Sequence, residues 1–206
     1  MVVVLEPHRI AYFPIPKVAN TSIRNGLRAA VGERGYSNSG NQTMGPLLRR
    51  RARGCWKFTV IRDPLARALS GYGNRVVFHR DIERAPVSRA LLRLRGLPVD
   101  PDLNTFFANL RSYMMVNDRI RRHMMLQRRY LGDALDYFDR IYRIDEIPQL
   151  AADLSEQLGR EVTIGREQTG GPKYKRADLS EQAESVLRDY LAPDYALLRD
   201  HYPEPW

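Results

Sequence analysis

Apolar and β-branched residues gather in three short runs, a pattern that predicts buried strands. The runs cover residues 9–15, 56–61 and 141–144. After each run, apolar residues recur every three or four positions, as they do along one face of a helix. Strands that alternate with helices favour an α/β fold with a mostly parallel sheet.

Capping residues indicate where these helices begin and end. Asn20 or Thr21 is a competent N-cap for the first helix, and Asp63, followed by a proline, is one for the second. Gly73 is expected to end the second helix, and Asp145 is expected to cap the third. Each helix therefore begins directly after a strand.

The segments between these elements differ in character. Residues 33–54 are rich in glycine, serine, asparagine and arginine, and they are expected to form an exposed loop. Residues 75–130 are arginine-rich and expected to be helical, whereas residues 165–177 are expected to form a glycine-rich basic loop. The last helix is expected to open at residues 178–181, where a capping-box-like pair occurs.

The composition is that of an ordinary globular protein. The chain has 206 residues, of which 43% are hydrophobic and 28% charged, and this balance excludes a wholly disordered chain. The single cysteine, Cys55, excludes an internal disulfide and a cysteine-based metal site. No apolar run approaches the ~18 residues of a membrane span. We therefore expect one domain over residues 1–206, no membrane span and a cytoplasmic location.

The charge balance points to an anionic partner. The chain has 33 Lys and Arg against 24 Asp and Glu, a formal net charge of +9. A run of arginines at residues 49–53 favours a solvated loop over a nucleic-acid patch. A nonenzymatic nucleic-acid-binding protein nevertheless stays open as an alternative on this charge alone.

The segment with the clearest chemistry is residues 14–24. It places a strand end, a tight loop, Lys17 and the hydroxyl groups of Thr21 and Ser22 directly before a helix. Unpaired backbone N–H groups and the helix dipole make such a helix start suitable for phosphate. The alternative is an ordinary strand–helix connection. The glycine frame of the nucleotide-triphosphatase loop is absent, which disfavours a P-loop-type kinase without removing it.

A second segment, residues 58–72, adds another anion-binding pattern. Arg62 ends a strand, and Ser70 follows two helical turns later. Together the two segments resemble the paired signatures of sulfotransferases that use 3′-phosphoadenosine 5′-phosphosulfate (PAPS). The resemblance implies a P-loop-like three-layer α/β domain with a small, mostly parallel central sheet flanked by helices. It assigns the first segment to the 5′-phosphosulfate, and Arg62 and Ser70 to the 3′-phosphate.

Two further stretches resemble the carbohydrate sulfotransferase branch. Residues 123–127 are similar to its His-Trp-x-Pro-Gln element, with methionine and leucine in place of tryptophan and proline, and residues 137–144 to its downstream strand. Residues 173–195 resemble its C-terminal basic loop and closing helix. The branch implies a sugar or glycan hydroxyl as acceptor, selected by residues 75–130. The nucleotide-binding residues implied are Lys17, Val18, Ala19, Asn20, Thr21, Ser22, Arg62, Ser70, Lys173 and Lys175.

Sulfuryl transfer resembles phosphoryl transfer, in which positioning and charge stabilisation dominate. The resemblance makes Lys17 and His123 the catalytic residues, with Lys17 neutralising charge on the leaving oxygen and His123 taking the acceptor's proton. Neighbouring arginines are expected to keep His123 neutral. His79, Asp81 and Glu83 are the alternative bases. No spacing in the sequence is typical of a metal site, and no metal is expected.

Overall fold

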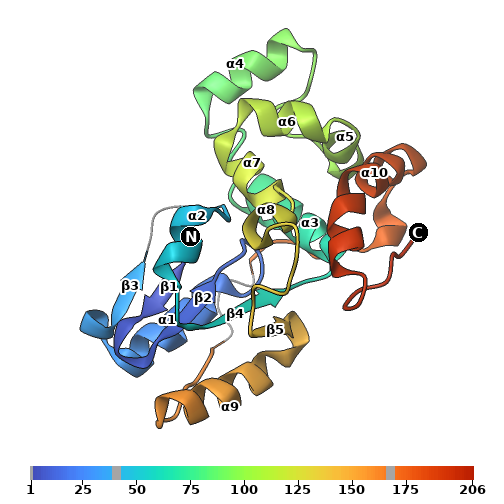
Figure 1. Cartoon of the computed structure of the whole chain (residues 1–206). Coiled ribbons are helices and arrows are strands. Elements are labelled where there is room, and N and C mark those ends of the chain that lie inside the picture. Colours follow the sequence, from blue (N-terminus) through green and yellow to red (C-terminus); the bar gives the residue numbers. More distant parts are fainter. Residues whose placement is uncertain (1, 39–42, 166–169) are drawn as a thin grey trace. The chain divides into compact units, whose positions relative to one another are not determined.

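The three predicted strands are present, and two further strands join them in one five-stranded sheet (Figure 1). The structure is a computed structural model that describes residues 2–38, 43–165 and 170–206. The sheet order is β3–β1–β2–β4–β5. The strands are β1 (Val3–Leu5), β2 (Ile10–Phe13), β3 (Tyr36–Asn38), β4 (Trp56–Ile61) and β5 (Arg140–Arg143).

The sheet is mixed. Strands β2, β4 and β5 are parallel neighbours, whereas β1 pairs antiparallel with both β2 and β3. The predicted α/β class is thereby confirmed, and the parallel part consists of the three strands that the hydrophobic pattern revealed. The antiparallel part comes from a short hairpin at the start of the chain and from an edge strand.

The expectation of an exposed loop over residues 33–54 is wrong. This stretch contains β3, which pairs with β1 so that Tyr36 lies opposite Leu5, and the helix α2 (Pro46–Arg51). Strand β3 has three half-exposed or exposed residues of mixed polarity, so it carries no alternating pattern. Its pairing partner lies about thirty residues away in the sequence, and only that partner makes it a strand.

The chain forms two compact units, which we describe separately. The first comprises residues 1–62 and 127–169, and the second comprises residues 63–126 and 170–206. The first contains the sheet and the helices α1 (Asn20–Val31), α2, α8 (Arg128–Leu131) and α9 (Ile147–Leu158). The second contains α3 (Pro64–Tyr72), a π-helix (Gly73–Phe78), α4 (Pro86–Leu94), α5 (Leu103–Ala108), α6 (Leu110–Val116), α7 (Asp118–Met124) and α10 (Glu181–Leu198). The helical character expected for residues 75–130 is confirmed.

Two neighbouring parallel strands form the centre of the first unit. The rings of Tyr12 on β2 and Phe58 on β4 stack with centroids 5.0 Å apart, and both residues are buried. The hydroxyl of Thr59 donates a hydrogen bond of 2.8 Å to the carbonyl oxygen of Phe13. Because parallel strands end at the same edge of a sheet, the loops that follow β2 and β4 begin side by side at that edge.

Several helix ends differ from the sequence expectation. Asp63 caps α3 as predicted, since its Oδ1 accepts a hydrogen bond of 2.7 Å from the N–H of Ala66. The helix α3 ends at Tyr72 with Gly73 as its C-cap, as predicted, but the backbone stays helical there and continues as the π-helix. The N-cap of α1 is Ala19 rather than Asn20 or Thr21.

The N-caps of α9 and α10 also differ from the residues that the sequence predicted. Asp145 lies in a short 3-10 turn (Ile144–Glu146), so α9 begins only at Ile147. Ser180 caps α10 by accepting a hydrogen bond from the N–H of Ala183, and Asp178 belongs to a separate 3-10 turn. In both cases a 3-10 turn holds the residue that was expected to cap the helix.

Buried aromatic rings form the centre of the second unit. Tyr72, Phe106, Phe107 and Tyr113 are all buried, with ring centroids 5.1 to 5.8 Å apart in the contacting pairs. The Tyr72 hydroxyl donates to the carbonyl oxygen of Pro101, and burial raises the pKa of this phenol.

Within the described residues, no helix is both long enough and apolar enough to cross a bilayer.

Candidate active site

The loop between β2 and α1 is tightly turned and anchored by buried side chains. Lys17 and Ala19 both have left-handed backbone conformations, with φ angles of 68° and 46°. This region costs a residue other than glycine about 1–2 kcal/mol, and such strain clusters at functional sites. Ile15 and Val18 are fully buried, so they hold the loop in place.

The start of α1 has no capping side chain. Its N-cap residue is an alanine, and its first turn contains no acidic residue. By contrast, side-chain oxygens cap α3, α5, α7 and α10, from Asp63, Asp102, Asn117 and Ser180. The N–H groups at a helix start together with the dipole attract anions, and here no carboxylate competes with them. The predicted anion site at residues 16–22 therefore has suitable electrostatics.

Arg62 joins this loop from the end of β4. Its guanidinium Nη1 donates a hydrogen bond of 3.3 Å to the carbonyl oxygen of Lys17. The two segments are 45 residues apart in the sequence. The structure thus places the Arg62 guanidinium against the backbone of Lys17, so the two predicted motifs are in contact. Arg62 is half-buried, which keeps part of its guanidinium accessible.

Gln127 holds the backbone of Arg62, a role that no sequence pattern revealed. Its amide Nε2 donates a hydrogen bond of 2.7 Å to the carbonyl oxygen of Arg62, and its Oε1 accepts one of 3.2 Å from the N–H of the same residue. The side chain is completely buried. Only an amide can donate and accept in this way. In the sequence, the one feature that could have drawn attention to Gln127 is its position at the end of the His123–Gln127 element.

We expect Gln127→Glu to loosen this arrangement. A carboxylate cannot donate to the Arg62 carbonyl and would place two oxygens face to face, so the free energy of unfolding should fall by ~2 kcal/mol. Adenosine 3′,5′-bisphosphate should also bind more weakly. Chemical denaturation and calorimetry measure the two effects. The exposed Gln149→Glu is the control, and an equal effect of both substitutions would contradict a special role for Gln127.

Both carboxylate oxygens of Asp63 accept hydrogen bonds at the start of α3. Its Oδ1 accepts from the N–H of Ala66, and its Oδ2 accepts a hydrogen bond of 2.9 Å from the Tyr195 hydroxyl. Among the residues described, no three histidine, cysteine, aspartate or glutamate side chains gather as they would around a metal ion. Ser70 lies on α3, two turns beyond this cap, and is half-buried.

His123 lies on α7, and a hydrogen bond to the backbone holds one of its ring nitrogens. Its Nδ1 is 2.8 Å from the carbonyl oxygen of Arg119. Because a carbonyl can only accept, Nδ1 carries the proton and a neutral ring has its lone pair on Nε2. Asp81 pairs with Arg119, and Asp118 pairs with Arg121 and Arg122. These ion pairs reduce the positive field that the sequence predicted around His123.

The alternative bases have other partners. The Asp81 carboxylate is buried between Arg75, at 2.6 Å, and Arg119, at 3.3 Å. Glu83 accepts hydrogen bonds from two nitrogens of Arg80. His79 is half-buried at the end of the π-helix, beside the Phe78 ring.

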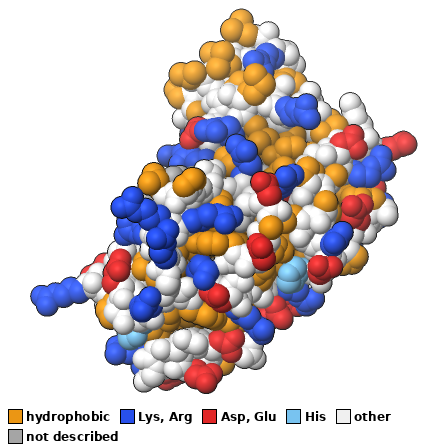
Figure 2. All heavy atoms as spheres, viewed as in Figure 1, with side chains coloured by type: hydrophobic (Ala, Val, Ile, Leu, Met, Phe, Trp, Pro, Cys, Tyr) orange, Lys and Arg blue, Asp and Glu red, His pale blue; other side chains and the backbone are white. Residues whose placement is uncertain are grey.

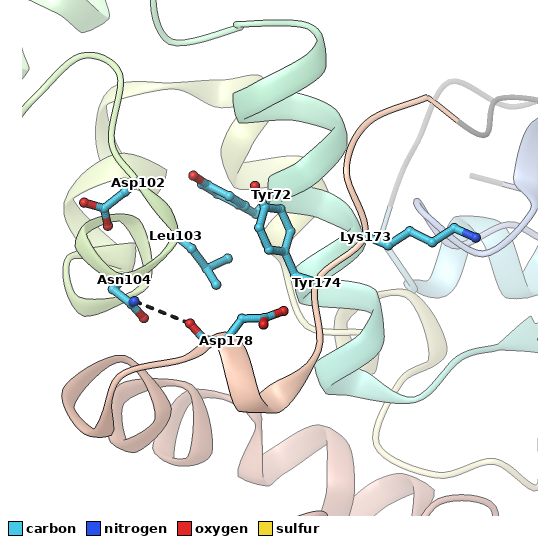
Figure 3. Close-up of a pocket in the computed structure, with 7 residues that line it drawn as sticks. All are labelled: Tyr72, Asp102, Leu103, Asn104, Lys173, Tyr174 and Asp178. Carbon is cyan, nitrogen blue, oxygen red and sulfur yellow. Dashed lines mark hydrogen bonds between the residues drawn. The ribbon is translucent and has the colours of Figure 1, made fainter.

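A pocket of about 530 Å³ lies within the second unit (Figure 3). The rings of Tyr72 and Tyr174 are 5.3 Å apart on one side, and Asp102 and Asn104 lie opposite. Hydrogen bonds from Thr105 lower the pKa of Asp102 and keep it ionised. The remaining lining residues are Leu103, Lys173 and Asp178.

The predicted basic loop runs along the rim of this pocket. Lys173 and Lys175 are both exposed, and the side chain of Lys173 extends away from the tyrosine rings (Figure 3). A Cβ atom at Gly73 would collide with the carbonyl oxygen of Pro172, so glycine is needed where the two backbones meet. This close contact between the two backbones holds the loop in place at Pro172. Residues 166–169 of the predicted loop lie outside the described residues.

On the face shown in Figure 2, the basic residues do not form a single patch. Lys and Arg side chains are dispersed over the face shown in Figure 2, with Asp and Glu among them. Within the run at residues 49–53, Arg51 donates a hydrogen bond to the Ser37 hydroxyl, and Arg49 lies 4.5 Å above the Tyr137 ring. The run was expected in a solvated loop, but most of it belongs to α2.

Comparison with known proteins gives one match. A family model described as the sulfotransferase family matches residues 1–199. This range includes the loop at Lys17, Arg62, the His123–Gln127 element and all of α10. No curated protein and no solved structure matches the chain at a significant level.

Proposed function

Because the chain belongs to the sulfotransferase family, we propose that it transfers a sulfuryl group from PAPS to a hydroxyl group of a sugar or glycan. The observation that carries this proposal is the hydrogen bond between Arg62 and the carbonyl oxygen of Lys17. It brings the guanidinium that the resemblance assigns to the 3′-phosphate against the loop that it assigns to the 5′-phosphosulfate. The family match over residues 1–199 also supports a single sulfotransferase domain.

The loop before α1 fits a 5′-phosphosulfate group. Its left-handed turns at Lys17 and Ala19 lead into a helix start that has neither a capping side chain nor an acidic residue. In this proposal the backbone N–H groups of Val18, Ala19 and Asn20 and the hydroxyls of Thr21 and Ser22 hold the anionic oxygens. PAPS supplies the activated sulfuryl group.

Two side chains have catalytic roles in the proposal. Lys17 places its ammonium group against the oxygen that gains charge as the sulfuryl group leaves. His123 accepts the proton of the acceptor hydroxyl at Nε2, since Nδ1 already donates to Arg119. Ser70 assists Arg62 with the 3′-phosphate, and Lys173 and Lys175 add positive charge near the nucleotide.

A carbohydrate acceptor is supported by the pocket in the second unit. Tyrosine rings offer flat apolar faces, and an ionised carboxylate and an amide offer hydrogen-bond partners for hydroxyl groups. We propose that Tyr174, Asp102 and Asn104 contact the acceptor, while the buried Tyr72 ring supports the ring of Tyr174. A cytoplasmic location is part of the proposal and rests on the single cysteine of the chain.

Calorimetry with nucleotides tests the function. Adenosine 3′,5′-bisphosphate should bind at least ~10-fold more tightly than AMP, because a charged hydrogen bond contributes roughly 1.5–3 kcal/mol. Arg62→Ala should remove most of this difference. Arg140→Ala, an exposed arginine at the start of β5, is the control and should preserve it. Equal affinity of the wild-type protein for the two nucleotides would refute the assignment.

The same experiment separates the alternative functions. A P-loop-type kinase should prefer ATP with Mg²⁺ over adenosine 3′,5′-bisphosphate. A nucleic-acid-binding protein should bind oligonucleotides with a steep dependence on salt and should lose little affinity in Lys17→Ala. The family membership and the engaged carboxylate of Asp63 both favour the sulfotransferase.

A further inference from the structure

Helix α4 has its apolar side turned to solvent. Its inward-facing residues are Ser88 and Leu92, which are 3% and 0% exposed. On the outward side, Val87, Leu91 and Leu94 are 71%, 39% and 84% exposed. A surface helix ordinarily shows the opposite arrangement, with its apolar stripe against the core. Figure 2 shows hydrophobic side chains together over α4, at the top of the view.

The exposed apolar residues form one continuous stripe. Val87, Leu91 and Leu94 have the spacing i, i+4, i+7, which places them on one face of the helix. Ala90 is also exposed and lies between them on the same face. We call these four residues the α4 stripe. Together they make a contiguous apolar surface of the kind that marks an interaction site.

Arginines border the α4 stripe on both sides. Arg93 lies next to Ala90 on one flank, and Arg95, the C-cap residue, follows the end of the helix on the Leu91 side, whereas Arg89 lies on nearly the opposite side of the helix. All three are exposed, and α4 contains no acidic residue. The surface is therefore apolar along its centre and cationic along its edges.

Polar contacts fix the orientation of α4. The Ser88 hydroxyl donates a hydrogen bond of 2.8 Å to the carbonyl oxygen of Val116. It also accepts one of 3.2 Å from Nδ2 of Asn117, which is itself buried. Rotating the helix to bury the α4 stripe would break both bonds and expose Leu92. The outward position of the stripe is thus part of the packing of this unit.

We propose that the α4 stripe docks on the surface of an anionic lipid bilayer. An apolar stripe between cationic flanks is the pattern of a helix lying in a membrane interface, with the apolar residues in the headgroup–acyl boundary and the arginines on lipid phosphates. A second copy of this chain fits less well, because a two-fold pairing of the stripes would bring arginine flanks together. The proposal is independent of the sulfotransferase chemistry.

Vesicle co-sedimentation of the full-length protein tests this proposal. The protein should bind vesicles of phosphatidylcholine mixed with phosphatidylglycerol and should bind pure phosphatidylcholine weakly. Leu94→Ser should lower the partition coefficient by about 10-fold, and Arg93→Ser by about 5-fold. Leu47→Ser and Arg199→Ser are the matched controls, since Leu47 is 72% exposed on α2 and Arg199 is exposed after α10. Both controls should bind as the wild-type protein does.

Three outcomes would overturn the proposal. The first is equal binding to neutral and anionic vesicles, and the second is an equal loss of binding in Leu47→Ser and Leu94→Ser. The third is an absence of vesicle binding together with a dimer that Leu94→Ser dissociates in analytical ultracentrifugation. Because Leu94 is exposed, Leu94→Ser should keep the wild-type melting temperature, and this measurement confirms that the variant is folded.

Discussion

Replacement of His123 by alanine should lower kcat by about two to four orders of magnitude, the usual contribution of a general base. The affinity for adenosine 3′,5′-bisphosphate should stay unchanged, because the proposed role of His123 concerns the acceptor hydroxyl. The hydrogen bond from Nδ1 to the carbonyl oxygen of Arg119 supports this role by leaving Nε2 as the proton acceptor. Initial rates at saturating PAPS, with a panel of sugar acceptors, measure the loss.

Two further variants make the test of His123 specific. His123→Gln preserves a polar side chain but cannot take up a proton at neutral pH, so it should be almost as inactive as His123→Ala. His79→Ala is the control, because His79 is the other histidine of the second unit that borders the predicted acceptor region. A large loss of turnover in His79→Ala with normal turnover in His123→Ala would transfer the role of base to His79.

Replacement of Lys17 by alanine should lower kcat by about 10²–10³-fold and weaken nucleotide binding much less. The proposed ammonium contact strengthens as charge grows on the leaving oxygen, so its removal raises the barrier more than it weakens the ground state. Alanine and lysine have similar backbone preferences, so the strained φ of 68° is retained. Steady-state kinetics together with calorimetry separate the two effects.

Lys57→Ala is the control for the loss of a lysine. Lys57 lies on β4 in the same unit, and its ammonium pairs with Asp139 at 2.7 Å. This variant should have a normal kcat, with at most a small loss of stability. If Lys17→Ala raised KM for PAPS and left kcat unchanged, Lys17 would be a binding residue without a catalytic role.

The sequence alone determined the features that depend on neighbouring residues. The parallel strands β2 and β4 are mainly runs of apolar and β-branched residues, and such runs specify buried strands without knowledge of their partners. Strand β5 has only Ile141 and Tyr142 between two arginines, and these two residues lay within the predicted run. The same holds for the Asp63 cap, where the side chain reaches a backbone N–H three residues away. The two predicted anion-binding segments could be recognised in the sequence because each occupies a single strand–helix junction.

Only the tertiary structure decided the features that depend on distant partners. Strands β1 and β3 have three residues each, and hydrogen bonds to other strands make them part of the sheet. The role of Gln127 depends on the two peptide groups of Arg62, which lie 65 residues away. The spacing of apolar residues in α4 specifies an apolar stripe, but it does not specify whether this stripe faces the core or the solvent. The anchoring of Ser88 by Val116 and Asn117 turns that stripe outward, and no local pattern contains this information.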